Sequence, residues 1–338
     1  MGLIRTVLGD VAAGDVGLIQ FHEHVLFDIV PPGANGDTAA EILPWDRFQT
    51  DYLSNVNPAN AHQTDVTIAA AELRAFAAAG GSLIVDQSVA GLARDAAGLA
   101  EASRASGVHV VAAAGTYTAP FLDAAQIAMT TAEMADLFTA EIKTGLDDTK
   151  VRAGLIGEIG CSWPLEPVEH RALLAAVDAQ HRTGASISVH PGRDPGACLQ
   201  IIDILGTAGA DLSRVVLCHM DRTYPDGTGV AALLDQGICV EWDFFGIEQS
   251  HYWMGDVELP TDRCRLRLID AMVAAGHGDR IVISHDICTR TRLRHWGGHG
   301  YGHVLTNVVP LMRRLGFDPA TIQNLVRDTA LRLLTLKE

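Results

Sequence analysis

The sequence predicts a (β/α)8 (TIM) barrel, an α/β fold, built as a single domain over residues 1–338. Short apolar segments alternate with longer segments of helical periodicity, and about eight such units follow one another along the chain. The strand segments are apolar throughout, which is typical of a parallel sheet covered on both faces, and eight βα units close into a barrel. An open, doubly wound sheet is the alternative fold. No G-x-G-x-x-G motif follows the first strand, which disfavours a dinucleotide-binding fold.

The chain begins with a short segment that precedes the repeating units. Residues 1–15 contain the turn signals Gly9-Asp10 and Gly14-Asp15, so we expect a hairpin there. A strand over 16–21 follows and leads into an irregular, proline-containing excursion over 28–60. Excursions of this length in compact domains are often functional.

The repeating units then follow in order. A helix over 64–79 is rich in Ala and Glu and ends at Gly80-Gly81. The further strands are predicted over 82–86, 109–115, 153–160, 186–190, 214–219, 238–243 and 280–286. The further helices are predicted over 93–106, 131–146, 167–183, 195–208, 227–236 and 261–275, with closing helices near 303–315 and 318–335.

Composition limits the class of protein. The formal charge of −16 and a pI of about 5.2 argue against nucleic-acid or anionic-membrane partners. The first residues do not resemble a signal peptide, and no apolar run reaches about 18 residues, so we expect no transmembrane helix. The six cysteines are scattered without a C-x-x-C motif, so we expect reduced thiols and a cytoplasmic protein.

Polar residues follow nearly every predicted strand at its C-terminal end. They are His22, His24, Asp86, Tyr117, Glu158, His190, His219, Asp243 and Asp286. In a barrel these ends converge on one face, where active sites lie. His22 and His24 stand two apart, so in an extended strand both side chains point to the same side.

The histidines and two of the carboxylates form a candidate metal site, since these residue types bind zinc, manganese or cobalt. The six candidate ligands are His22, His24, Glu158, His190, His219 and Asp286. Six ligands exceed what one tetrahedral zinc with an open position needs, and they suit two ions that share a carboxylate. Glu158 is the natural bridge by strand order. Asp286 lies on the last strand, which closes beside the first, so it can bind a metal and contact the shared water.

Several motifs resemble the phosphotriesterase-related family of the amidohydrolase superfamily. They are Phe21–His24 (FHEH), Gly157–Gly160 (GEIG), Val189–Arg193 (VHPGR), Cys218–Asp221 (CHMD), Ser284–Thr289 (SHDICT) and the longer segment Trp296–Pro310. They occur in the family's order and cover nearly the whole chain. The ending Asp328-Thr329-Ala330 departs from the Asn-Pro expected near the last helix.

The resemblance implies a binuclear centre. Its more buried ion would be held by His22, His24, Glu158 and Asp286, and its more exposed ion by Glu158, His190 and His219. The best-known phosphotriesterases use a carboxylated lysine as the bridge. Glu158 instead resembles the phosphotriesterase homology and related-protein branches, which puts fast phosphotriester turnover in doubt. The resemblance also implies a homodimer.

The expected activity is metal-dependent hydrolysis with two divalent ions, zinc first and manganese or cobalt as alternatives. A metal-bridging hydroxide would attack a carbonyl or phosphoryl centre while Asp286 accepts the proton. An amide, lactone or carboxylic ester is the first expected substrate, and a phosphotriester is the alternative. A non-catalytic ligand-binding relative that retains the metal site is a third interpretation.

Arginines after the strand ends are candidate contacts for a small-molecule substrate. Arg193, Arg222, Arg290 and Arg292, with Arg294 nearby, could clamp an anionic group, because arginine suits carboxylate, sulfonate and phosphate. The alternative is solvated loop charge or pairing with the many acids. Tyr117 is a further candidate substrate contact. The remaining candidates for apolar walls, several of which could instead pack in the core, are Trp163, Trp242, Tyr252, Trp253 and Trp296.

Overall fold

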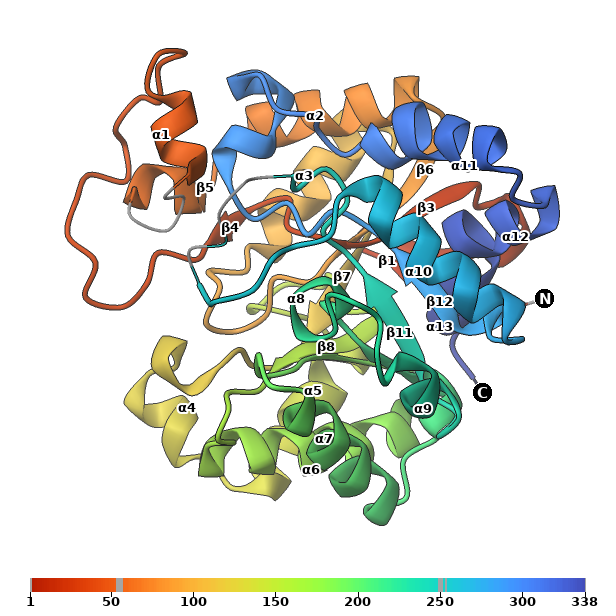
Figure 1. Cartoon of the computed structure of the whole chain (residues 1–338). Helices are drawn as coiled ribbons and strands as arrows, with labels where there is room; N and C mark the ends of the chain where they lie inside the picture. Colours follow the sequence, from red (N-terminus) through yellow and green to blue (C-terminus); the bar gives the residue numbers. More distant parts are fainter. Residues whose placement is uncertain (1, 53–56, 249–251, 253, 338) are drawn as a thin grey trace.

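The computed structural model describes residues 2–52, 57–248, 252 and 254–337. Eight parallel strands form a nearly closed barrel with helices around it (Figure 1). In the order in which they pair, they are β3 (Leu18–Glu23), β6 (Gly81–Asp86), β7 (His109–Ala114), β8 (Leu155–Gly160), β9 (Ile187–His190), β10 (Val215–Leu217), β11 (Cys239–Trp242) and β12 (Ile281–Ile283). The predicted (β/α)8 barrel is confirmed.

The last strand returns beside the first and closes the barrel through hydrogen bonds at their carboxyl ends. The backbone N–H of His22 donates to Ser284 Oγ at 3.0 Å, and the N–H of Asp286 donates to the His22 carbonyl at 3.1 Å. This contact brings together the segments that carry His22 and Asp286, which lie at opposite ends of the sequence.

The barrel interior holds a separate apolar cluster. Side chains from β3, β6, β7, β8, β10, β11 and β12 meet there, and Ile4, Leu333 and Leu334 join the cluster. Ile4 belongs to the N-terminal hairpin of β1 (Leu3–Thr6) and β2 (Gly9–Ala12), which confirms the hairpin predicted over 1–15. The two ends of the chain lie side by side (Figure 1), since Leu336 N–H donates to the Leu3 carbonyl at 3.2 Å.

The outer helices cover the barrel with one continuous apolar cluster. They are α2 (Val66–Ala78), α3 (Ala96–Ser106), α5 (Thr131–Lys143), α6 (Pro167–Thr183), α7 (Pro195–Thr207), α9 (Val230–Leu234) and α10 (Asp262–Ala274). Their ends follow local chemistry. Asp65 caps α2 by accepting from Thr67 and Ile68, and α6 begins at Pro167 and ends before Gly184 at φ 70°.

The closing helices depart from the regular helices predicted over 303–315 and 318–335. A π-helical turn (Val304–Val308) precedes α11 (Val309–Leu315), and a second one (Asn324–Asp328) separates α12 (Pro319–Gln323) from α13 (Thr329–Leu334). The helix predicted over 227–236 is shorter than expected because Gly227 and Gly229 both adopt left-handed conformations, at φ 77° and 97°.

The excursion over 28–60 is partly ordered into elements that the sequence did not predict. The short strand β4 (Phe27–Asp28) pairs with β5 (His62–Gln63), and α1 (Arg47–Tyr52) projects to one side of the molecule (Figure 1). Two further short helices, α4 (Ala124–Ala128) and α8 (Met220–Thr223), were also missed. Among the described residues, no helix combines the length and apolarity needed to span a bilayer.

Candidate active site

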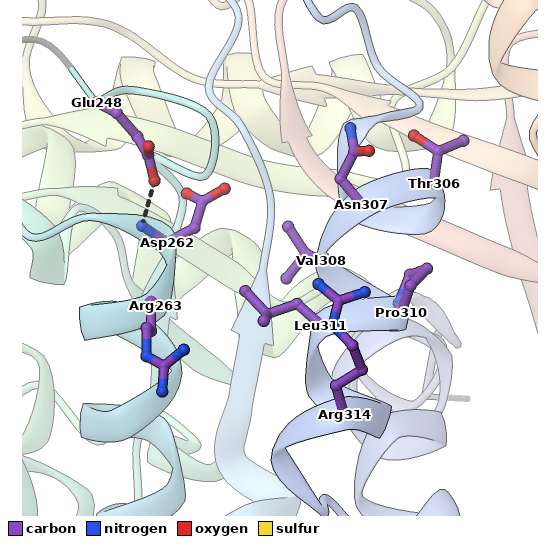
Figure 2. Close-up of a pocket in the computed structure, with 9 residues that line it drawn as sticks. All are labelled: Glu248, Asp262, Arg263, Thr306, Asn307, Val308, Pro310, Leu311 and Arg314. Carbon is purple, nitrogen blue, oxygen red and sulfur yellow. Dashed lines mark hydrogen bonds between the residues drawn. The ribbon is translucent and has the colours of Figure 1, made fainter.

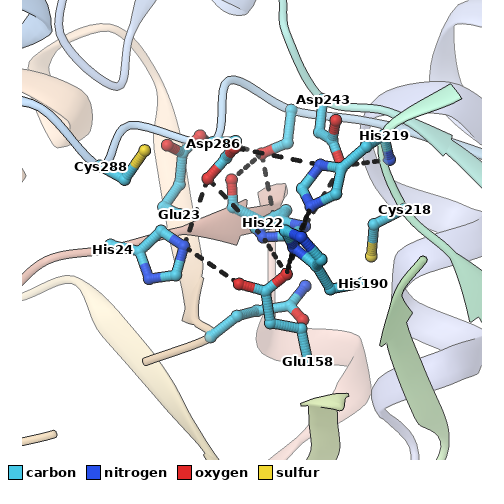
Figure 3. Close-up of polar contacts among 12 residues, drawn as sticks. His22, Glu23, His24, Glu158, His190, Cys218, His219, Asp243, Asp286 and Cys288 are labelled. Carbon is cyan, nitrogen blue, oxygen red and sulfur yellow. Dashed lines mark hydrogen bonds and ion pairs between the residues drawn. The ribbon is translucent and has the colours of Figure 1, made fainter. Parts of the chain in front are cut away.

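The carboxyl ends of the strands bring all six candidate ligands together (Figure 3). They come from β3 and the residues after it (His22, His24), β8 (Glu158), β9 (His190), the turn after β10 (His219) and the turn after β12 (Asp286). None of the six residues is more than 8% exposed. The sequence prediction that these side chains share one location is therefore consistent with the geometry.

Glu158 lies between two groups of nitrogen ligands. On one side, its Oε1 is 3.6 Å from His24 Nε2, and its Oε2 is 3.7 Å from His22 Nε2. Asp286 Oδ1 joins this group at 3.2 Å from His24 Nε2. On the other side, Glu158 Oε2 is 2.9 Å from His190 Nδ1 and 3.3 Å from His219 Nε2. One carboxylate thus faces both groups.

Hydrogen bonds behind the rings of His22 and His24 leave their Nε2 atoms, which face Glu158, available to bind a metal. His24 Nδ1 is 3.0 Å from Ser88 Oγ, and that hydroxyl donates onward to the Leu26 carbonyl, so the ring must donate from Nδ1. His22 Nδ1 is 3.2 Å from Glu241 Oε2. Its Nε2 is buried without a hydrogen-bond partner among the described residues, as expected for a nitrogen that awaits a metal. The donor set therefore fits divalent metal ions.

Two of the candidate ligands have unusual backbone conformations. His219 and Asp286 are non-glycine residues in the left-handed region, at φ 60° and 49°. Such residues cost about 1–3 kcal/mol each and persist only where the surroundings fix them. The N–H of His219 donates to Asp243 Oδ2 at 2.9 Å, and the Asp286 N–H donates to the His22 carbonyl. These bonds hold the two turns that present the ligands.

The electrostatic environment keeps three of the candidate ligands, Glu158, Asp286 and His190, in protonation states that can bind metal. Burial acts to raise the pKa of Glu158, but His190 and His22 hold it well below its usual value. Burial similarly opposes a lowered pKa for Asp286, which the hydrogen bond to His24 produces. Burial lowers the pKa of His190 to about 3. At neutral pH both carboxylates are therefore ionised and His190 is neutral.

Sequence reasoning missed the acidic residues that hold these ligands from behind. Asp243 Oδ2 is 3.0 Å from His219 Nδ1 and 3.3 Å from His22 Nδ1, so one carboxylate contacts a ligand from each group. The sequence places Asp243 at a strand end, but its contacts with His22 and His219 depend on side-chain packing and were not predicted. Glu23, inside the FHEH motif, accepts from Ser284 Oγ and from the N–H groups of His285 and Ile287, and it lies 2.5 Å from His285 Nδ1.

A cavity of about 660 Å³ opens beside the ligands, with His190, His219 and Asp286 in its wall. Of the predicted substrate contacts, Tyr117, Arg193 and Arg222 line it. Its other walls are largely apolar and include Ile29, Pro31, Phe121, Trp163, Phe244, Ile247 and Tyr252. A volume of this size accommodates a small molecule.

Some of the side chains predicted to contact the substrate do not line this cavity. The lining contains Arg292 but not Arg290, within the part of the chain that the structure describes. The Arg290 guanidinium lies 5.2 Å from the Trp296 ring centroid, and its Nη1 donates to the Ala40 carbonyl at 3.4 Å. Trp242 is fully buried, and Trp253 falls outside the described residues.

A second, smaller hollow of about 300 Å³ lies between α10 and the segment that contains α11 (Figure 2). Glu248 accepts there from the N–H of Asp262 at 2.8 Å. The candidate ligands are not part of its lining, so it is separate from the cavity described above.

Comparison with known proteins identifies the family. The model of the phosphotriesterase family matches residues 2–334. This chain belongs to the phosphotriesterase family. The N-acetyltaurine hydrolase of Rattus norvegicus is 37% identical to it over 345 residues, covering 99% of both chains. The N-acetyltaurine hydrolase of Dictyostelium discoideum is 35% identical over 364 residues, covering 99% of this chain and 98% of the relative.

One solved structure is also similar to this chain. The resiniferatoxin-binding protein from Rhodobacter sphaeroides superposes with a TM-score of 0.91 at 33% identity, covering 98% of this chain and 95% of that one. Together with the curated hydrolases, the family makes this chain a hydrolase. The interpretation of the chain as a non-catalytic relative is therefore not supported.

Proposed function

We propose that this chain is a binuclear metal-dependent hydrolase that cleaves the amide bond of a small N-acyl compound of the N-acetyltaurine class. The observation that carries the proposal is the position of Glu158, whose carboxylate faces His22 and His24 on one side and His190 and His219 on the other. The 37% identity to an N-acetyltaurine hydrolase over 99% of the chain supports an amide as substrate.

The six ligands would hold two divalent ions, zinc first, with manganese or cobalt as alternatives. His22, His24, Glu158 and Asp286 would bind one ion, and Glu158, His190 and His219 the other. When bound, such a pair lowers the pKa of a shared water towards neutrality and polarises the carbonyl group of the substrate.

Asp286 is the residue to which we assign proton transfer. Its carboxylate is ionised, lies 3.2 Å from His24 Nε2 and lines the cavity. It can therefore accept a proton from the attacking water and deliver it to the amide nitrogen that leaves. Tyr117, whose hydroxyl is 3.5 Å from His190 Nδ1, and Arg193 and Arg222 would contact the substrate.

Hydrolysis of substrate before and after metal removal tests the proposal. We expect turnover of N-acetyltaurine that a chelator abolishes and that zinc, manganese or cobalt restores. Lactones, carboxylic esters and aryl phosphotriesters are assayed in parallel, because the same attack chemistry applies to each. Turnover of a phosphotriester but of no amide would replace the proposal by the phosphotriesterase alternative. Activity that resists complete metal removal would overturn the metal-dependent mechanism.

We also propose that the protein is a homodimer that works in the cytoplasm. Trp45 and Phe48 are 76% and 75% exposed, and Tyr52 stacks on Phe48 at 6.1 Å, so α1 presents an aromatic face that a second copy would cover. The six cysteines are all unpaired, as in a reducing compartment. Light scattering after gel filtration should give the mass of two chains. It should give the mass of one chain for Phe48→Asp if α1 forms the interface.

A further inference from the structure

Arg222 is a buried cation in the wall of the active-site cavity. It belongs to the short helix α8, which begins directly after His219, and it is only 3% exposed. Its Nη2 donates to the Pro191 carbonyl at 2.8 Å and lies 3.2 Å from His190 Nε2, and its Nη1 is 3.3 Å from Thr223 Oγ1. Within the described residues it forms no ion pair with a carboxylate.

Other buried arginines of this chain pair with carboxylates or donate most of their N–H groups to the protein, although Nε of Arg214 has no hydrogen-bond partner among the described residues. Arg265 pairs with Asp221 and Asp262, and Arg94 pairs with Glu141. Arg214 donates to three backbone carbonyls far from the cavity, those of Arg332, Leu333 and Thr335. Arg292 also lines the cavity, but it donates to the His285 carbonyl and to Thr289 Oγ1, both at 3.0 Å.

A buried charge without a counter-ion is costly, so its retention in a cavity wall points to an anionic ligand. A second cation reinforces this point. Arg193 lines the same cavity from the exposed side, and its Nε donates to the Tyr252 hydroxyl at 3.2 Å. Burial, together with the charge of Arg193, lowers the pKa of Arg222, although arginine stays protonated in proteins. Among the described residues, neither of these two arginines in the cavity wall forms an ion pair with a carboxylate.

The position of Arg222 relative to the reacting centre limits the shape of the ligand. The imidazole of His190 separates the two, since its Nε2 faces Arg222 at 3.2 Å and its Nδ1 faces Glu158 at 2.9 Å. An acid group bound at Arg222 is thus one ring away from the centre at which the amide would be attacked. This spacing suits a substrate in which a short chain joins the acid group to the amide.

We propose that Arg222, with Arg193 at the rim, is the subsite that binds the acid group of the substrate, a sulfonate or carboxylate at the end of a short N-acyl amine. The inference rests on the proposed hydrolase function and names its substrate class. The guanidinium fork matches the oxygen geometry of both acids. Arg222 therefore selects anionic amides over neutral ones.

Steady-state kinetics of Arg222→Gln with three substrates of matched length test the proposal. N-acetyltaurine carries a sulfonate, N-acetyl-β-alanine a carboxylate, and N-(2-hydroxyethyl)acetamide no charge. We expect KM for the acids to rise about 100-fold, the effect of losing a charge-assisted hydrogen bond, with a change of less than about threefold in kcat/KM for the neutral amide. The acid with the larger loss is the better match to the site. Equal losses for the acids and the neutral amide would overturn the proposal.

Arg214→Gln is the matched control, because it also removes a buried arginine without a carboxylate partner. It should lower the melting temperature and leave KM for both acids unchanged. Arg222→Lys keeps the positive charge but lacks the paired N–H donors of the guanidinium. Its affinity for the acids should therefore lie between that of Arg222→Gln and that of the wild type. If Arg222→Lys behaves like Arg222→Gln and both variants are folded by circular dichroism, charge at this position is not what binds the acid, and the proposal fails.

Calorimetric titration of the metal-loaded protein with 1-propanesulfonate provides a readout that does not depend on turnover. Wild-type protein should bind it, with 1-propanol as the neutral comparison, and Arg222→Gln should bind it about 100-fold more weakly. Loss of binding in the variant supports the subsite even if no amide is hydrolysed, in which case only the proposed activity fails. Hydrolysis of amides with unchanged propanesulfonate binding in the variant would instead reject the subsite alone.

Discussion

At the scale of single residues, Asp243 connects the two halves of the candidate metal centre. Its Oδ2 lies 3.3 Å from His22 Nδ1 and 3.0 Å from His219 Nδ1, and it accepts from the His219 N–H. A carboxylate in this position fixes the tautomer and the orientation of both rings. Its influence on both ions should therefore exceed that of a residue that supports one ligand.

Asp243→Asn should weaken binding of both ions by about 10–100-fold, the usual effect of changing a residue that orients metal ligands. Competition with a fluorescent chelator measures the two affinities. Asp270→Asn, an exposed position on α10, is the control and should bind metal as the wild type does. Unchanged affinities in folded Asp243→Asn protein would show that the rings are held by other contacts.

Metal uptake should also be coupled to proton release. Burial acts to lower the pKa of His219, but Asp243 raises it above its usual value of 6.5, so the metal-free ring holds its proton to a higher pH than a free histidine. A ligand must lose that proton, so metal affinity should fall as pH decreases through the raised pKa. Calorimetry near pH 7 in buffers of different ionisation enthalpy measures the released protons. Buffer-independent heats would contradict the expectation.

At the scale of elements, the turn after β12 was not predicted from the sequence. A strand was predicted over 280–286, but β12 ends at Ile283, and the chain then turns so that Asp286 adopts φ 49°. The carboxylate of Glu23, on β3, accepts from the backbone N–H of His285 in this turn. The His285 ring in turn accepts at Nε2 from the Val304 N–H. These partners are remote in sequence, so no local pattern reveals them.

Glu23→Gln should destabilise the protein by about 1.5–3 kcal/mol, the range for a hydrogen bond to a buried charged group, because an amide cannot accept from His285 and from all the backbone donors that the carboxylate serves. Urea denaturation measures the free energy of unfolding. Glu101→Gln, an exposed position on α3, provides the comparison and should change it little. A loss below about 1 kcal/mol would mean that the turn does not depend on the Glu23 charge.

The regular elements were predicted well because their signals are local. The helix predicted over 167–183 coincides with α6, since Pro167 marks its start and Gly184 its end. The strand ends that carry ligands were also predicted, since an apolar segment followed by His or Asp is readable in the sequence. The burial of Arg222 and the contacts of Asp243 were not predictable, because both depend on how distant side chains pack.

At the scale of the whole molecule, the barrel explains how scattered residues form one site. Parallel strands in a closed sheet place their carboxyl ends together, so the fold prediction alone indicates which residues converge. The single-domain prediction over 1–338 stays a prediction. The inner cluster, which joins Ile4 to Leu333 and Leu334, supports it because it links the first strand to the last helix.

A single domain should unfold in one calorimetric transition, and metal removal should shift that whole transition to lower temperature, since bound ions stabilise only the folded state. Differential scanning calorimetry of metal-loaded and chelator-treated protein measures both effects. Two resolved transitions, of which only one moves on metal removal, would contradict a single cooperative domain.

The metal content of the purified protein is the sharpest test of the binuclear centre that we propose around Glu158. Mass spectrometric elemental analysis of protein prepared without chelators should find about two divalent ions per chain, and Glu158→Gln should retain markedly fewer. One ion or none per folded wild-type chain, after zinc, manganese and cobalt have each been supplied, would contradict the account.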